Sequence, residues 1–171
     1  MNIKASVVLL LILTPVVLMS HISWSQEENG LLFNVDGRDV DFVGIVKDTW
    51  RTTTKRCDAL TELESADRRF KIIQTLVQTY SPPDSTQIRD IHIWTSGSWA
   101  IAEVEFERLL PAVVTIKNID THASIVDNAI WSGITKPWKS GPFIRAYLQK
   151  NATDTPENLL NCFELRTGSF N

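Results

Sequence analysis

The stretch that decides the fold is residues 88–107, IRDIHIWTSGSWAIAEVEFE. Apolar and polar side chains alternate in both halves, the pattern of strands that bury one face. Ser96, Gly97 and Ser98 separate the halves and favour a tight turn. The stretch therefore predicts an antiparallel hairpin of strands 88–94 and 99–107.

The chain after this hairpin predicts two more strands, at residues 112–119 and 124–131. The segment Asp120-Thr121-His122 between them is typical of a turn. Because short connections join all four strands, we expect an antiparallel meander.

Helical patterns flank the meander on both sides. Residues 39–60 predict a first helix, with Asp39 as its N-cap, and residues 65–80 a second, capped by Ser65. Two more helices are expected, one opening at Pro142 and one at Pro156 and Glu157. The apolar stripe of the first helix recurs at spacings near three and four, at Val43, Val46, Trp50, Cys57 and Leu60.

Together these elements predict a single α+β domain, with the N-terminal and C-terminal helices packed on one face of a four-stranded antiparallel meander. The order of elements over residues 39–131 resembles the cystatin-like and nuclear-transport-factor-2-like folds. The resemblance rests on element order, with no motif. It implies a curved sheet around a helix, and it implies little about activity because such folds host both enzymes and binding modules.

The first 25 residues predict a secretory signal peptide. Lys4 is followed by an uncharged, apolar run at residues 5–19 and by a polar segment with small residues before Gln26. We expect cleavage after Ser25 and an exported domain, periplasmic or secreted, over residues 26–171. The alternative is a retained N-terminal anchor, because residues 5–26 carry no formal charge over a length that could cross a bilayer.

Two cysteines, Cys57 and Cys162, remain after the leader. In an oxidising compartment an even number with one possible pairing predicts a disulfide. Both residues fall on apolar faces of predicted helices, so we expect both thiols to point inward.

The charge balance and the motifs narrow the function. The chain has 17 Lys and Arg against 20 Asp and Glu, which disfavours general binding of nucleic acid. It contains no nucleophile elbow, phosphate-binding loop or zinc helix. We therefore lean towards a protein without catalytic activity, and expect no metal and no cofactor.

One acid–base pair stands out, since Asp90 and His92 share one face of the first strand of the hairpin. The alternative interpretation is a histidine bonded to a carboxylate on a solvated sheet face. The row Glu103, Glu105 and Glu107 on the next strand is interpreted in the same way, as a solvated acidic face.

Tryptophans near turns are the candidate binding residues, because aromatic side chains beside loops line pockets and anchor interfaces. The alternative is that they fill gaps between the sheet and the helices. The four are Trp94, Trp99, Trp131 and Trp138.

Two functions of different classes follow. The first is an exported, non-catalytic module that binds a partner protein or a small apolar ligand, and touches a membrane only through an uncleaved leader. The second is a small hydrolase or isomerase that uses Asp90 and His92 inside a cavity of the sheet.

Overall fold

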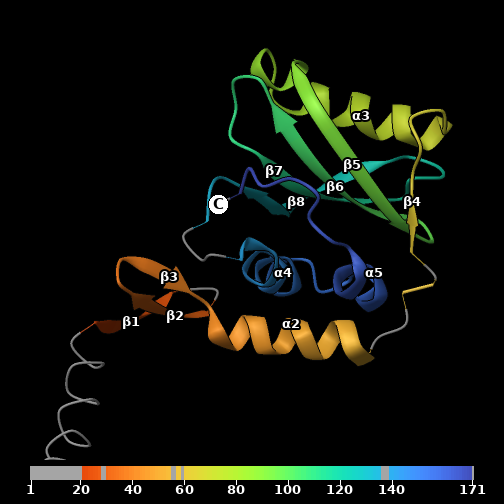
Figure 1. The fold of residues 1–171 in the computed structure, drawn as a ribbon. Helices are drawn as coiled ribbons and strands as arrows, with labels where there is room; N and C mark the ends of the chain where they lie inside the picture. Colours follow the sequence, from red (N-terminus) through yellow and green to blue (C-terminus); the bar gives the residue numbers. More distant parts are fainter. Residues whose placement is uncertain (1–20, 28–29, 55–56, 59, 136–138, 171) are drawn as a thin grey trace, which may run out of the picture.

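A computed structural model of the chain describes residues 21–27, 30–54, 57–58, 60–135 and 139–170. These residues form an α+β fold with two antiparallel sheets (Figure 1). One sheet has three strands in the order β1-β2-β3, and the other has five in the order β4-β5-β6-β7-β8.

The elements follow one another along the chain. The first half contains β1 (Ile22–Glu27), β2 (Gly30–Val35), β3 (Arg38–Val40), α2 (Phe42–Thr54), β4 (Thr61–Glu62), α3 (Arg68–Tyr80) and the 3₁₀ turn η1 (Asp84–Thr86). The second half contains β5 (Ile88–Ser96), β6 (Trp99–Phe106), β7 (Ala112–Lys117), β8 (Ser124–Ser132), α4 (Ser140–Asn151) and α5 (Glu157–Cys162).

The predicted meander is confirmed, because β5, β6, β7 and β8 pair antiparallel in chain order. Ser96 pairs with Trp99 at the hairpin, and Gly97 takes a φ of 57° in the turn between them. The structure adds the two-residue strand β4 at the edge beside β5. So short a strand shows no periodicity, which is why the sequence does not reveal it.

Helices cover both faces of the five-stranded sheet. Helix α3 packs Ile73 and Val77 against one face, while α4 and α5 pack Ile144 and Leu159 against the other. The expectation that helices lie on one face is therefore wrong. The physical reason is that the inner residues of β6 are buried whichever face of the sheet they point to, so both faces need a cover.

The acidic row on β6 is also not a solvated face. Glu103 is fully buried and accepts hydrogen bonds from the backbone N–H groups of Arg166 and Thr167, at 2.8 and 3.0 Å. Glu105 is buried too, and hydrogen bonds from Ser169 and then Arg89 lower the pKa of its carboxyl below the ordinary value. Residues 166–169 have no regular secondary structure, so no sequence period shows that they cover these carboxylates.

Helix α2 lies outside the sheet layers, against α4 and the strand β2 (Figure 1). Its N-cap is Asp41, whose Oδ1 accepts a hydrogen bond from the Gly44 N–H at 2.7 Å. The predicted cap, Asp39, pairs with Asn34 in the three-stranded sheet instead. Likewise α3 is capped by Asp67, which accepts from the Arg69 N–H at 2.8 Å, and not by Ser65.

The predicted disulfide between Cys57 and Cys162 is confirmed, with Cα atoms 5.5 Å apart across 105 residues of sequence. Cys162 ends α5, but Cys57 lies beyond the end of α2 and is exposed. The prediction that both thiols point inward from helices is wrong for Cys57, because α2 ends at Thr54. Within the described residues, no helix is long and apolar enough to cross a membrane.

Candidate functional site

Strand β5 brings the predicted acid–base pair together. His92 Nε2 lies 3.3 Å from Asp90 Oδ2, and His92 Nδ1 lies 3.1 Å from Glu62 Oε1. Arg166 donates to the other oxygen of Glu62 at 2.9 Å. Burial raises the pKa of Glu62, but hydrogen bonds from Arg166 and His92 outweigh it, so the pKa lies below its ordinary value. Sequence reasoning missed Glu62 because it lies on the two-residue strand β4.

This group is a hydrogen-bonded cluster of side chains at the surface. The Asp90 side chain is half exposed and that of His92 is 30% exposed, and neither residue lines the cavities described below. Trp94, two residues along the same face, is buried in the core with its ring 6.2 Å from that of His92. Among the described residues, no group of three or more His, Cys, Asp or Glu could hold a metal ion.

Three of the four candidate tryptophans lie on the sheet face that α4 and α5 cover. Trp94 packs against Phe163 with ring centroids 6.1 Å apart. Trp131 makes edge contacts with Phe143 and Tyr147. Trp99 is half-buried beside the same cluster. These three pack between the sheet and the helices, and Trp138 lies outside the described residues. That any of them binds a ligand stays a prediction.

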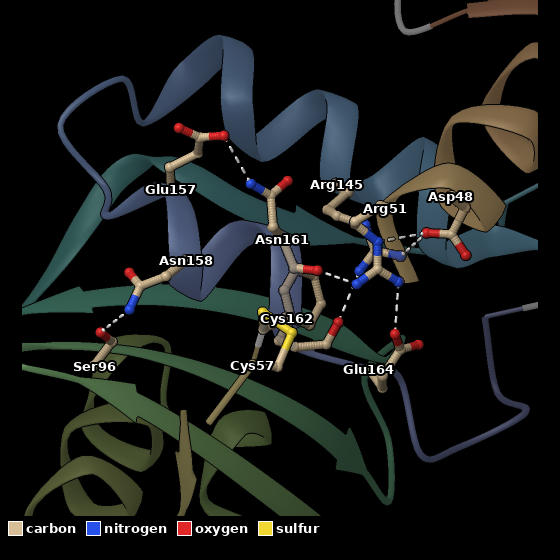
Figure 2. The surroundings of a disulfide bond; sticks show 11 residues. Asp48, Arg51, Cys57, Ser96, Arg145, Glu157, Asn158, Asn161, Cys162 and Glu164 are labelled. Atoms are coloured by element: carbon tan, nitrogen blue, oxygen red, sulfur yellow. Dashed lines mark hydrogen bonds and ion pairs between the residues drawn. A yellow bond between two sulfur atoms is a disulfide. The ribbon is translucent and has the colours of Figure 1, made fainter. Parts of the chain in front are cut away.

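A charged cluster built around two buried arginines joins α2 to the C-terminal third beside the disulfide (Figure 2). Asp48 accepts hydrogen bonds from Arg51 at 2.9 Å and from Arg145 at 2.6 Å. Arg51 also donates to Glu164 at 2.6 Å and to the Asn161 carbonyl. We call Asp48, Arg51, Arg145 and Glu164 the arginine cluster.

The electrostatics of the arginine cluster suit a structural clamp. Burial raises the pKa of Asp48, but the charge of Arg145 and the bonds from Arg51 lower it by more. The pKa of Asp48 therefore lies below its ordinary value. Arg145 also donates to the Phe163 carbonyl at 2.7 Å. A cavity of about 240 Å³ between α2 and α4 borders Asp48, Arg51 and Arg145, but these charges are paired with one another.

An apolar pocket of about 320 Å³ lies where α3 ends over the sheet. Its lining comes from α3 and the turn after it, the end of β6, the loop to β7, and strands β7 and β8. The lining residues are Val77, Tyr80, Ser81, Ser85, Phe106, Leu109, Leu110, Ala112, Val114, Ile125, Ile130 and Ser132.

Burial and charge distinguish this pocket from the cavity beside the arginine cluster. Val77, Ala112 and Val114 are buried in its walls, whereas Tyr80 and Leu110 are exposed. Among the residues that the structure describes, no acidic or basic side chain lines it. The sequence carries one signal of this site, the pair Leu109-Leu110 in a loop, where apolar side chains have no strand or helix to bury them.

Comparisons with protein-family models, curated proteins and solved structures find no match to this chain. The structure itself shows the α+β class. The resemblance to cystatin-like and nuclear-transport-factor-2-like folds is not confirmed and stays a prediction.

Proposed function

We propose that the protein is a non-catalytic binding module that holds a small, neutral, apolar molecule in the pocket at the end of α3. The single observation that carries this proposal is the 320 Å³ pocket with its uncharged lining. Its volume is at the lower end of the range of small-molecule sites, about 300–1,000 Å³.

The chemistry of the walls selects the ligand class. A charged ligand would lose its hydration in the pocket without gaining an opposite charge, which costs several kcal/mol or more. An apolar ligand instead gains about 25 cal/mol for each Å² of its surface removed from water. Tyr80 lines the pocket and is 52% exposed, and its hydroxyl is a hydrogen-bonding group for a hydroxyl or carbonyl of the ligand.

Three exposed apolar positions allow a matched test, because the same Asp substitution can be made at each without burying a charge in the core. Leu110 is 54% exposed and lines the pocket, whereas Ile134 (60%) and Val46 (68%) do not line it. The probe is the neutral dye N-phenyl-1-naphthylamine, followed by its fluorescence. We expect saturable binding to the unaltered chain, and an affinity about tenfold lower in Leu110→Asp, the equivalent of about 1.4 kcal/mol.

Ile134→Asp and Val46→Asp should bind the dye as the unaltered chain does. Equal loss in all three variants, or no saturable binding to the unaltered chain, would contradict the proposal. A circular dichroism spectrum of each variant checks that the fold is retained.

The second function, a hydrolase or isomerase that uses Asp90 and His92, has less support. The pair has the geometry of a hydrogen-bonded carboxylate and imidazole, but it lies in a surface cluster and lines neither cavity described above. Its test is His92→Ala, which would abolish turnover of any substrate found.

Export of the domain is part of the proposal, and the disulfide supports it, because such bonds persist in oxidising compartments.

A further inference from the structure

Helix α2 turns its apolar stripe away from the protein. Phe42, Val43, Val46 and Trp50 are 50%, 44%, 68% and 73% exposed. Arg51, on the opposite side of the helix, is its one buried residue. An exposed stripe of this length on a helix is unusual in a soluble domain and marks a surface that something else covers.

The stripe continues onto the three-stranded sheet. Phe42 packs edge-on against Phe33 of β2, with ring centroids 5.6 Å apart. Phe33 pairs directly with Trp24 of β1, and side chains of directly paired residues share one face of a sheet. Trp24 is 71% exposed. We call Trp24, Phe33, Phe42, Val43, Val46 and Trp50 the outer apolar surface.

In the sequence, an apolar N-terminal segment comes directly before this surface. Residues 5–19 carry no charge, and Ile22 begins β1 three residues later. The predicted cleavage site after Ser25 falls within β1, which pairs with β2 along all six of its residues. Cleavage there would remove Ile22–Ser25 from the strand, and with them Trp24 from the outer apolar surface. The pairing therefore favours the alternative that the leader is retained.

We propose that the N-terminal segment stays in the chain as a membrane anchor and that the outer apolar surface lies on the lipid bilayer it enters. An amphipathic helix with Trp and Phe on its apolar side is typical of proteins that lie in the interface of a membrane. In the sequence the apolar run ends at residue 19, shortly before the strand that carries Trp24, so an anchor there would keep this surface close to the bilayer. The partner is therefore a lipid surface, in preference to a protein.

The experiment measures the depth of Trp50 in the full chain. The chain is reconstituted into phosphatidylcholine vesicles whose acyl chains are brominated, and tryptophan fluorescence is recorded for the unaltered protein and for Trp50→Phe. Because phenylalanine keeps the surface apolar, the difference between the two isolates the emission of Trp50. We expect this difference to be strongly quenched by brominated lipid and shielded from acrylamide.

The same difference is measured in two further backgrounds. Val46→Asp puts a charge in the middle of the surface and should abolish the quenching of Trp50, while Ile134→Asp, at an exposed site elsewhere, should leave it unchanged. Quenching that persists in Val46→Asp, or Trp50 emission that acrylamide reaches equally with and without vesicles, overturns the docking.

Retention of the leader has its own readout. Mass spectrometry of the chain recovered from cells should find Met1, or the residue after it, at the N-terminus. A chain that begins at Gln26 overturns the anchor. A stable dimer in sedimentation that Val46→Asp dissociates would assign the surface to a second copy instead. Dye binding in the pocket reports on the proposed function separately, since Val46 does not line that pocket.

Discussion

Helices α2 and α3 are each 13 residues long and each carries an apolar stripe. However, α3 buries its apolar side, whereas α2 buries its polar side. Helix α3 puts Ile73 and Val77 into the core between the helix and the sheet. Helix α2 exposes its stripe and buries Arg51 within the arginine cluster. A period of 3.6 thus indicates a helix and its two sides, but does not decide which side faces the protein.

The difference lies in what holds each helix. Burial of apolar area holds α3, whereas α2 is held by hydrogen-bonded charges and by the disulfide that follows it. Gly44 allows the close approach of α2 to α4, since a Cβ there would lie 2.9 Å from Cβ of Pro142. A helix held in this way keeps its apolar side available for another contact.

Among the contacts that hold α2, the disulfide should have the largest effect on stability when it is removed. Cys57→Ser combined with Cys162→Ser opens a loop of 105 residues, which should lower the free energy of unfolding by about 4–5 kcal/mol. Urea denaturation of the oxidised chain and the double variant measures this. The matching check is thiol titration of the unfolded, unreduced chain, which should find no free thiol. A loss of less than about 1 kcal/mol would mean that the bond does little to hold α2.

Asp48→Ala tests the arginine cluster. The substitution removes the carboxylate that buried Arg145 bonds at 2.6 Å, and removing one partner of a buried ion pair costs about 3–5 kcal/mol. Equilibrium unfolding in urea measures the loss. Asp154 is exposed, so Asp154→Ala should change stability by less than about 0.5 kcal/mol. Equal small effects at both positions would show that the cluster contributes nothing to the attachment of α2.

The same substitution in the two helices gives the most direct contrast. Val77 on α3 is 3% exposed and Val46 on α2 is 68% exposed. Val77→Ala deletes two buried methyl groups and should cost about 2 kcal/mol, while Val46→Ala should cost less than about 0.5 kcal/mol. Thermal unfolding of both variants in one buffer is the measurement. A comparable loss for Val46→Ala would indicate that the α2 stripe is buried in solution.

Much of this fold could be predicted from the sequence, because its strands and helices show the spacing of apolar residues that is typical of each. The alternation around Gly97 predicts the meander, and the spacing of Phe70, Ile73 and Val77 predicts α3. What could not be predicted depends on contacts between distant segments. Residues 166–169 cover Glu103 without any period of their own, and Arg145 meets Asp48 across 97 residues of sequence.

The position of the candidate pocket could not be predicted from the sequence. The pocket draws its walls from α3, β7, β8 and the loop at Leu109-Leu110, which are far apart along the chain. The tryptophans predicted to bind are prominent in the sequence, yet Trp94 and Trp131 pack within the sheet and its helices. Side-chain type alone does not distinguish a tryptophan that lines a pocket from one that fills the core.

Low pH should have the smallest effect, a difference between the two helices in how readily they open in acid. The Asp48 pKa is lower in the folded chain than its ordinary value of 3.8, so ionisation of this carboxyl favours the folded state. Its contribution is complete above the unfolded pKa and is lost as pH falls through the folded pKa. Below about pH 4, α2 should therefore detach more readily, whereas α3 keeps its apolar contacts and loses only its N-cap carboxylate Asp67, whose pKa the bonds from Arg69 also hold below the ordinary value. Hydrogen exchange, corrected for the intrinsic rate at each pH, should rise over residues 42–54 before it rises over residues 68–80. Simultaneous loss of protection in both helices would mean that α2 and α3 open only together, and that charge and apolar contact do not define separately stable parts.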